Sequence, residues 1–291
     1  MNVFSERHTR NDLRWIIDSP SLLDGNAFYR QTGIEVFEFP KKLNQESDEV
    51  VLPSVQDDFP RTHRVGDYFE QLAIWALAQS NEVEVLASHQ QIFESNRTVG
   101  EIDCIYQDEG ARITHLEVAV KFFLMEGQPS KGNQYDLAQF VGPNPRDNFQ
   151  SKIDHMVRRQ LQLGAKTEYP IDRKQVLLRG YLFYPKTDSI VENSLPALVN
   201  HDHLRGTWCR ADTIFSHLEW IGAEQYWIVP KPHWLAPLDP SDRESHDSAG
   251  LGKLIQEELE GRATAIYFQS AGRDGMVGHH FVVDNQWPHL V

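Results

Sequence analysis

The sequence predicts a mixed α/β fold in which helices pack on one mixed sheet. Three observations support it. Residues 65–80 are apolar at helical spacing, residues 100–124 alternate as two strands joined by a Gly-containing loop, and residues 65–184 follow the order helix, three strands, helix, strand. From Pro185 onward the composition changes, which indicates an α+β C-terminal extension on this α-β-β-β-α-β core.

The N-terminal part predicts one short helix followed by a loop. Leu13 and Ile16 recur at helical spacing over residues 9–17, and Ser19-Pro20 ends the helix. Residues 41–58 are polar, acidic and interrupted by Pro53, as in a loop. We assign residues 1–62 to an N-terminal helix and acidic loop that pack on the core.

The core, residues 63–185, begins with a helix over residues 65–80. Its apolar residues cover most of the circumference, so the helix is largely buried. Glu70 lies on this apolar surface, and a carboxylate there needs a partner or a metal ion. The partner would be an arginine such as Arg64 or Arg97.

Residues 83–93 form the next expected strand, which leads into the central hairpin. In GEIDCIYQDEGARITHLEVAVKFFL (100–124), apolar and polar residues alternate on both sides of a loop at residues 107–111. Glu101 and Asp103 therefore share one face of the first strand, and Glu117, Ala119 and Lys121 share one face of the second. If Gln107 pairs with Ala111, Glu101 lies opposite Glu117, and Asp103 lies opposite His115.

The carboxylates of the hairpin predict a cation site. Like charges opposite each other destabilise a sheet unless a cation lies between them, and hard oxygen ligands suit Mg²⁺ or Mn²⁺. Lys121 would orient an attacking water and offset charge on a phosphate. The alternative is a solvated strand face on which Lys121 blocks edge-to-edge pairing.

A basic helix is expected at residues 147–163, with Asp147 as its N-cap and Gly164 as its end. Lys152, His155 and Arg159 lie near one another on one side, where they would follow a phosphate backbone or form a solvated face. Lys131, in the Gly- and Pro-containing loop at residues 127–144, is a further candidate phosphate contact. A strand at residues 175–184 completes the core.

The extension, residues 186–291, predicts helices at 195–201 and 251–260 and strands at 225–229, 263–270 and 278–283. Its histidine pairs, His201 with His203 and His279 with His280, do not have the spacing of a known zinc site.

Composition limits the function further. The 28 basic and 42 acidic residues give 28 − 42 = −14, which disfavours loose binding to nucleic acid, although residues 146–174 hold seven Lys/Arg against four acids. The chain has no apolar run long enough for a membrane span and no signal-peptide pattern at its start, so we expect a cytoplasmic protein without a membrane partner. Two isolated cysteines exclude a disulfide framework.

Two acids and a lysine resemble the signature of the PD-(D/E)XK nuclease superfamily. These residues are Asp103, Glu117 and Lys121. That superfamily usually places its lysine two residues after the second acid, where this chain has Ala119. The chain also looks like a bacterial family of uncharacterised proteins placed in that superfamily. The segments that carry this likeness are NDLRWIIDSPSLL (11–23), GDYFE (66–70), residues 116–124, Gly142-Pro143 and HLRG (203–206).

The resemblance implies a restriction-endonuclease-like core and a metal-dependent nuclease that acts on DNA or RNA. Asp103 and Glu117 would bind Mg²⁺ or Mn²⁺, Glu70 would contribute from the preceding helix, and Lys121 would act at the phosphate. The alternative is a catalytically degenerate nuclease-like fold that binds nucleic acid or protein, which the displaced lysine and the net charge favour. The sequence leaves the oligomeric state open.

Overall fold

The computed structural model describes residues 6–39, 62–95, 97–129, 134–186, 194–239, 244–261 and 265–289. The expected loop at residues 41–58 and Lys131 lie outside these residues. The helices are α1 (Glu6–Asp18), α2 (Gly25–Thr32), α4 (Val65–Ala78), α5 (Phe149–Arg158), α6 (Ile214–Ile221) and α7 (Ser248–Gly261). The strands are β1 (Glu35–Val36), β2 (Val83–Glu94), β3 (Arg97–Asp108), β4 (Ile113–Met125), β5 (Phe140–Val141), β6 (Arg173–Pro185), β7 (Leu204–Arg210), β8 (Gln225–Ile228), β9 (Ala265–Ala271) and β10 (Val277–Val283).

The described strands form a ten-stranded mixed sheet in the order β2-β3-β4-β6-β7-β10-β9-β8, with β1 beside β6 and β5 beside β4. The pairs β2–β3 and β3–β4 are antiparallel, whereas β6–β7 and β7–β10 are parallel. The predicted mixed α/β class is therefore confirmed, and so is the order α4, β2, β3, β4, α5, β6.

The chain divides into two compact units whose segments interleave. Unit 1 comprises residues 1–121, 152–180 and 197–203, and unit 2 comprises residues 122–151, 181–196 and 204–291. Strands β4 and β6 each begin in unit 1 and end in unit 2. Every candidate site residue that the structure describes lies in unit 1.

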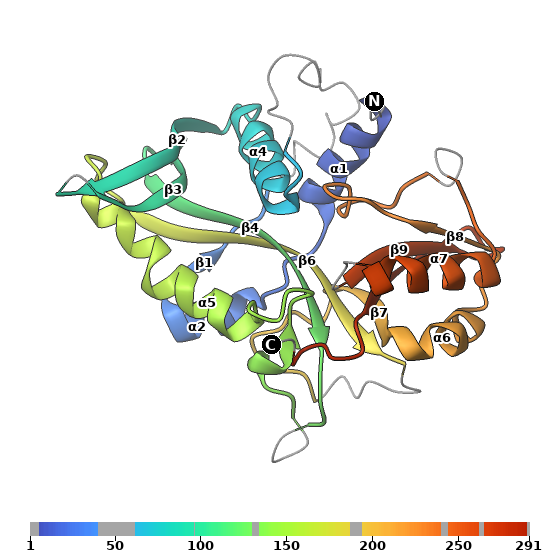
Figure 1. Cartoon of the computed structure of the whole chain (residues 1–291). Coiled ribbons are helices and arrows are strands. Elements are labelled where there is room, and N and C mark those ends of the chain that lie inside the picture. The colour runs from blue at the N-terminus through green and yellow to red at the C-terminus, as the bar shows by residue number, and fades with distance from the viewer. Residues whose placement is uncertain are drawn as a thin grey trace. The chain divides into compact units, whose positions relative to one another are not determined.

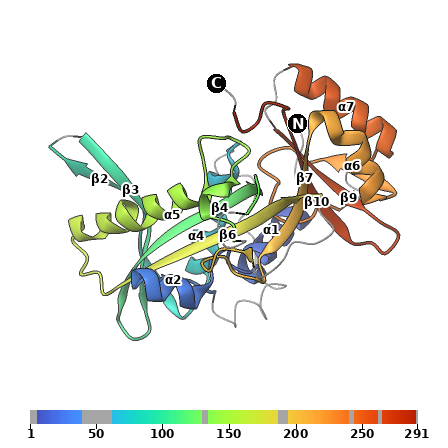
Figure 2. The same cartoon turned by 90° about the horizontal axis from the view of Figure 1, so that it is seen from below.

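In unit 1, helix α4 packs against β2 and α1, and a 3₁₀ segment at Gln160–Lys166 packs against β3 (Figure 1). Helix α4 buries apolar residues on most sides, as its sequence predicts, including Phe69, Leu72 and Leu77. A cluster of Ile92, Ile102, Ile105 and Leu163 holds the β2–β3 hairpin against the 3₁₀ segment. Figure 2 shows the two long strands of this hairpin from below. Apolar contacts thus anchor β3, the strand that carries Asp103.

The hairpin register differs from the expected one by two residues. Gln107 pairs with Ile113, and Ile105 pairs with His115, so the predicted pairing of Gln107 with Ala111 is wrong. The turn is longer because the Asp108 side chain accepts hydrogen bonds from the backbone N–H groups of Gly110 and Arg112 (2.9 and 3.0 Å). Extended along both strands, this register puts Asp103 across from Glu117.

The helix at residues 147–163 is shorter than predicted. Helix α5 ends at Arg158, and a 3₁₀ segment follows from Gln160. At its start, Asn148 rather than Asp147 acts as the cap, since its side chain accepts from the backbone N–H of Ser151 at 2.9 Å. Arg159 consequently lies outside the α-helix.

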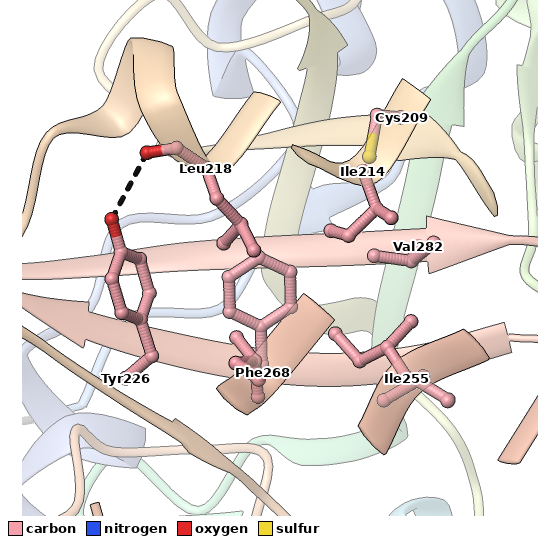
Figure 3. Close-up of a cluster of buried hydrophobic side chains, with 9 residues drawn as sticks. Cys209, Ile214, Leu218, Tyr226, Ile255, Phe268 and Val282 are labelled. Carbon is pink, nitrogen blue, oxygen red and sulfur yellow. Dashed lines mark hydrogen bonds between the residues drawn. The ribbon is translucent and has the colours of Figure 1, made fainter. Parts of the chain in front are cut away.

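Unit 2 has its own apolar core. Helices α6 and α7 pack around the cluster that Figure 3 shows, in which Tyr226 donates to the carbonyl oxygen of Leu218 at 3.0 Å. The strands at 225–228, 265–271 and 277–283 and helix α7 follow the prediction within a few residues. The expected helix at 195–201 is wrong, because this segment forms turns and Val199 makes a β-bridge with Leu23.

Across the described parts of the chain, no helix combines the length and the apolar character that crossing a membrane requires.

Candidate metal site

Two buried carboxyl groups form the centre of the candidate site. Asp103 on β3 is 8 % exposed and Glu117 on β4 is 1 % exposed. The Asp103 Oδ2 atom accepts a hydrogen bond from the backbone N–H of Val118 at 2.8 Å, which fixes the acid against β4. The two carboxyl groups lie close enough for each to act on the pKa of the other. The structure therefore brings the two predicted acids together.

The environment disfavours two negative charges at this position. Burial, and next the charge of Glu117, raise the pKa of Asp103 to about 8. Burial likewise raises the pKa of Glu117 to about 8. In the absence of a cation the pair therefore retains protons at neutral pH, whereas a divalent ion would replace them.

His115 orients Glu117 from within the same strand. Its Nε2 atom lies 2.9 Å from Glu117 Oε1, and both side chains are fully buried. Burial lowers the pKa of His115 to about 4, so the imidazole is neutral and makes one hydrogen bond with Glu117 through Nε2. The other ring nitrogen, Nδ1, is buried and has no hydrogen-bond partner within the described residues. The other carboxylate oxygen, Oε2, is buried and has no hydrogen-bond partner within the described residues.

The Oε2 atom of Glu117, which has no hydrogen-bond partner within the described residues, is a position where a metal ion could bind. A buried carboxylate oxygen is costly unless something binds it, and the donors nearby are hard carboxylate oxygens of the kind that Mg²⁺ and Mn²⁺ prefer. The acids Asp103 and Glu117 fit such an ion. The orientation of Glu117 by His115 matches the support that metal-binding carboxylates receive in proteins.

Glu70 reaches the same region from α4. Burial and then the charge of Asp103 raise the pKa of Glu70 to about 7. Its ion-pair partner is His89 on β2, whose Nδ1 atom lies 3.0 Å from Glu70 Oε1, rather than the arginine that the sequence suggested. The same Nδ1 atom lies 3.6 Å from Glu101 Oε1.

The position two residues after Glu117, which the motif reserves for lysine, holds the buried Ala119. Lys152 on α5 supplies a positive charge that acts on both Asp103 and Glu117 and lowers the pKa of each. The Lys152 Nζ atom donates to Gln160 Oε1 at 3.3 Å, so the 3₁₀ segment positions the lysine. Lys121 instead exerts its charge on His155.

The predicted basic row, Lys152, His155 and Arg159, lies together along α5 and the residue that follows it. Partial desolvation lowers the pKa of His155, and the charges of Lys152, Arg159 and Lys121 lower it further. His155 and Arg159 are exposed, and Lys152 is half-buried. Of the predicted phosphate contacts, only Lys131 is not among the described residues.

The sequence interpretation missed the roles of His89, His115 and Lys152 at the carboxylates. His115 carried a usable signal, because it stands two residues before Glu117 and so shares its strand face. His89 carried none, since its place depends on the β2–β3 register and on a backbone φ of 51°. Lys152 acts from a different element, which the hairpin sequence cannot indicate.

Comparison with known proteins identifies a family and no activity. The family model described as Domain of unknown function (DUF1853) matches residues 11–276, which is most of the chain. Searches of curated proteins and of solved structures find no match.

Proposed function

The chain belongs to that family of unknown function, and from the site itself we propose that the protein is a metal-dependent nuclease that hydrolyses phosphodiester bonds. The observation that carries the proposal is the buried pair Asp103 and Glu117, with the unpartnered Oε2 oxygen of Glu117. Burying two acids side by side costs stability, and a bound divalent cation offsets that cost.

Two further observations support a PD-(D/E)XK-like site. The element order α4, β2, β3, β4, α5, β6 is the one that the resemblance implies, with the acids on β3 and β4. Glu70 lies on the helix before the sheet, and its pKa responds to the charge of Asp103. In this proposal Asp103, Glu117 and Glu70 hold Mg²⁺ or Mn²⁺.

When bound, the ion supplies Lewis-acid activation of a water and of a phosphate oxygen. The protein's own groups do the rest. Lys152 offsets negative charge that develops on the phosphate, in place of the lysine missing at Ala119. The nucleic-acid backbone is held beside the acids by Lys121, His155 and Arg159. We expect Lys131 to contact a phosphate of the same backbone.

The second candidate is a nuclease-like protein that binds nucleic acid or protein without cleaving. Ala119 favours it, because the motif lysine is absent from β4, and so does the net charge of −14. It differs from the first candidate in one measurable respect, since binding would persist without turnover that depends on a metal ion.

Cleavage assays separate the two candidates. We expect Mg²⁺- or Mn²⁺-dependent cleavage of labelled single- or double-stranded DNA or RNA, and we expect Asp103→Asn and Glu117→Gln each to abolish it. Glu109→Gln is the matched control, because Glu109 is an exposed acid of the same hairpin. Circular dichroism establishes that each variant is folded.

Cleavage at the wild-type rate by Asp103→Asn would refute the nuclease proposal. Binding of oligonucleotides without cleavage, under every divalent ion tested, would instead select the second candidate.

A further inference from the structure

A second group of potential metal ligands lies at the exposed end of the site. It consists of Glu70 on α4, His89 on β2 and Glu101 on β3, whose ligand atoms all lie within 4.8 Å of one another. The side chains of His89 and Glu101 are 43 % and 44 % exposed, and that of Glu70 is 21 % exposed. An ion can therefore reach this group from solvent.

The sheet register explains why these residues meet. Ser88 pairs with Cys104 and Gln90 pairs with Ile102, so His89 stands across from Asp103, and Gln91 pairs with Glu101. Adjacent residues on one strand face put His89 beside both Asp103 and Glu101. Glu70 belongs to this group and also lies near enough to the buried acids for its charge to interact with those of Asp103 and Glu117.

The distances suit a shared ion. Two ligands at right angles on an ion with bonds of about 2.1 Å are about 3.0 Å apart, and tetrahedral ligands are about 3.4 Å apart. His89 Nδ1 lies 3.0 Å from Glu70 Oε1 and 3.6 Å from Glu101 Oε1. The three atoms can therefore bind one cation with small side-chain movements.

The charged groups around Glu70, His89 and Glu101 also favour a bound cation. When ionised, the carboxyl groups of Asp103, Glu101 and Asp67 act on Glu70 and raise its pKa, whereas His89 lowers it. Independently, the buried Glu117 has an oxygen without a hydrogen-bond partner in the described structure, and its charge and that of Glu70 interact. A divalent cation would offset the repulsion between these carboxylates once they are ionised.

We propose that Glu70, His89 and Glu101 form a second divalent-cation site, with Glu70 bridging to the ion held by Asp103 and Glu117. One nitrogen and two carboxylate ligands favour a first-row transition ion such as Mn²⁺ or Zn²⁺ over Mg²⁺. Two ions that share a bridging carboxylate would hold both the attacking and the leaving oxygen of a phosphodiester. The catalytic role of the second ion rests on the proposed function. The existence of the second metal site does not depend on that function.

The test counts Mn²⁺ ions bound to the purified full-length protein, by the loss of the free-ion electron paramagnetic resonance signal at physiological salt. We expect two tightly bound ions per chain in the wild type and one in His89→Gly. Glycine suits the φ of 51° at this position, so the substitution relieves the backbone while removing the ligand. Glu101→Gln should also bind one ion, and His63→Ala, which changes an exposed histidine of the same unit, should bind two.

The outcomes are distinguishable. Equal counts in the wild type, His89→Gly and Glu101→Gln would overturn the second site and would make the His89 contacts an ion pair only. Asp103→Asn should keep the ion bound at His89. If the counts follow the prediction while no nucleic acid is cleaved, the metal site stands and the proposed function fails.

Discussion

At the scale of single residues, the candidate site depends on groups that position other groups. Glu117 presents its free Oε2 atom because His115 holds Oε1 at 2.9 Å, and Asp103 is fixed by the backbone N–H of Val118. The acids were predictable because strand alternation puts chemistry-bearing residues on one face. The groups that hydrogen-bond to these acids were not predictable, because such hydrogen bonds depend on three-dimensional contacts that strand alternation does not define.

His115 should therefore control the affinity for the ion. Replacing His115 by Ala leaves Glu117 without its orienting hydrogen-bond partner, and we expect Mg²⁺ affinity to fall about 10- to 100-fold. His115→Gln keeps a donor near the place of Nε2 and should restore most of the affinity. Calorimetric titration measures both variants, and unchanged affinity in His115→Ala would contradict this role.

Lys152 and Lys121 should differ in their effects on turnover. Because the charge of Lys152 acts on both acids, Lys152→Met should lower kcat by about 100-fold or more. Because Lys121 acts on His155, Lys121→Met should chiefly raise KM for nucleic acid. Steady-state kinetics separates the two effects, and the reverse assignment would return the catalytic role to Lys121.

At the scale of elements, the long periodic segments were predictable and the short or capped ones were not. The apolar circumference of α4 and the alternation of β3 and β4 predict their elements directly. The hairpin register was missed by two residues because Asp108 organises a longer turn through its own side chain. Helix α5 stops early because a 3₁₀ segment packs its Leu163 against the β2–β3 hairpin, a tertiary contact that periodicity cannot indicate.

The contact between β4 and β6 gives a prediction at this scale. Gly180 on β6 has φ of 137°, and a Cβ atom there would lie 1.7 Å from the carbonyl oxygen of Lys121. Gly180→Ala should therefore lower the free energy of unfolding by about 2 to 4 kcal/mol, from the strained φ and from overpacking.

Gly66 on α4 is the matched control, because a Cβ atom there has no neighbour within 4 Å. Gly66→Ala should be neutral or stabilise by up to about 1 kcal/mol. Urea denaturation followed by circular dichroism measures both variants. Equal stability of Gly180→Ala and the wild type would show that the two strands can separate at this point without cost.

At the scale of the whole molecule, the two units bury different sets of titratable groups. Unit 2 buries His217, His279 and His280, and burial lowers the pKa of His217 and His279 to about 4 and that of His280 well below its usual value. These rings are held in side-chain hydrogen bonds, such as that of His280 with Ser270 at 2.9 Å. Unit 1 buries Asp103 and Glu117, whose pKa values are raised to about 8, and it also buries His115, whose pKa is lowered to about 4.

The pH dependence of stability should therefore differ between the units. A histidine with a lowered pKa in the folded state costs stability as pH falls below about 6.5, by up to about 1.4 kcal/mol per pH unit down to about 4. Acids with raised pKa values stabilise unit 1 below about pH 4, and this contribution is lost as pH rises toward about 8. Unit 2 should thus weaken on acidification only, whereas unit 1, which holds one such histidine and both acids, should also weaken on alkalinisation when no divalent ion is present.

Hydrogen exchange of peptides from each unit, measured in a chelator at pH 5 and at pH 8 with correction for the intrinsic exchange rate, separates these responses. Adding Mg²⁺ should protect unit 1 more at pH 8 than at pH 5, because the ion must displace protons from the acids. Identical pH responses in the two units would contradict the assignment of the buried charges.

The most direct test of the central claim is calorimetric titration of Mg²⁺ or Mn²⁺ into the wild type and into Asp103→Asn at pH 8. If Asp103 and Glu117 hold an ion, the wild type binds it and the variant loses that binding while remaining folded. If neither protein binds either ion, even with an oligonucleotide present, the buried acids are structural and the metal-dependent mechanism is wrong.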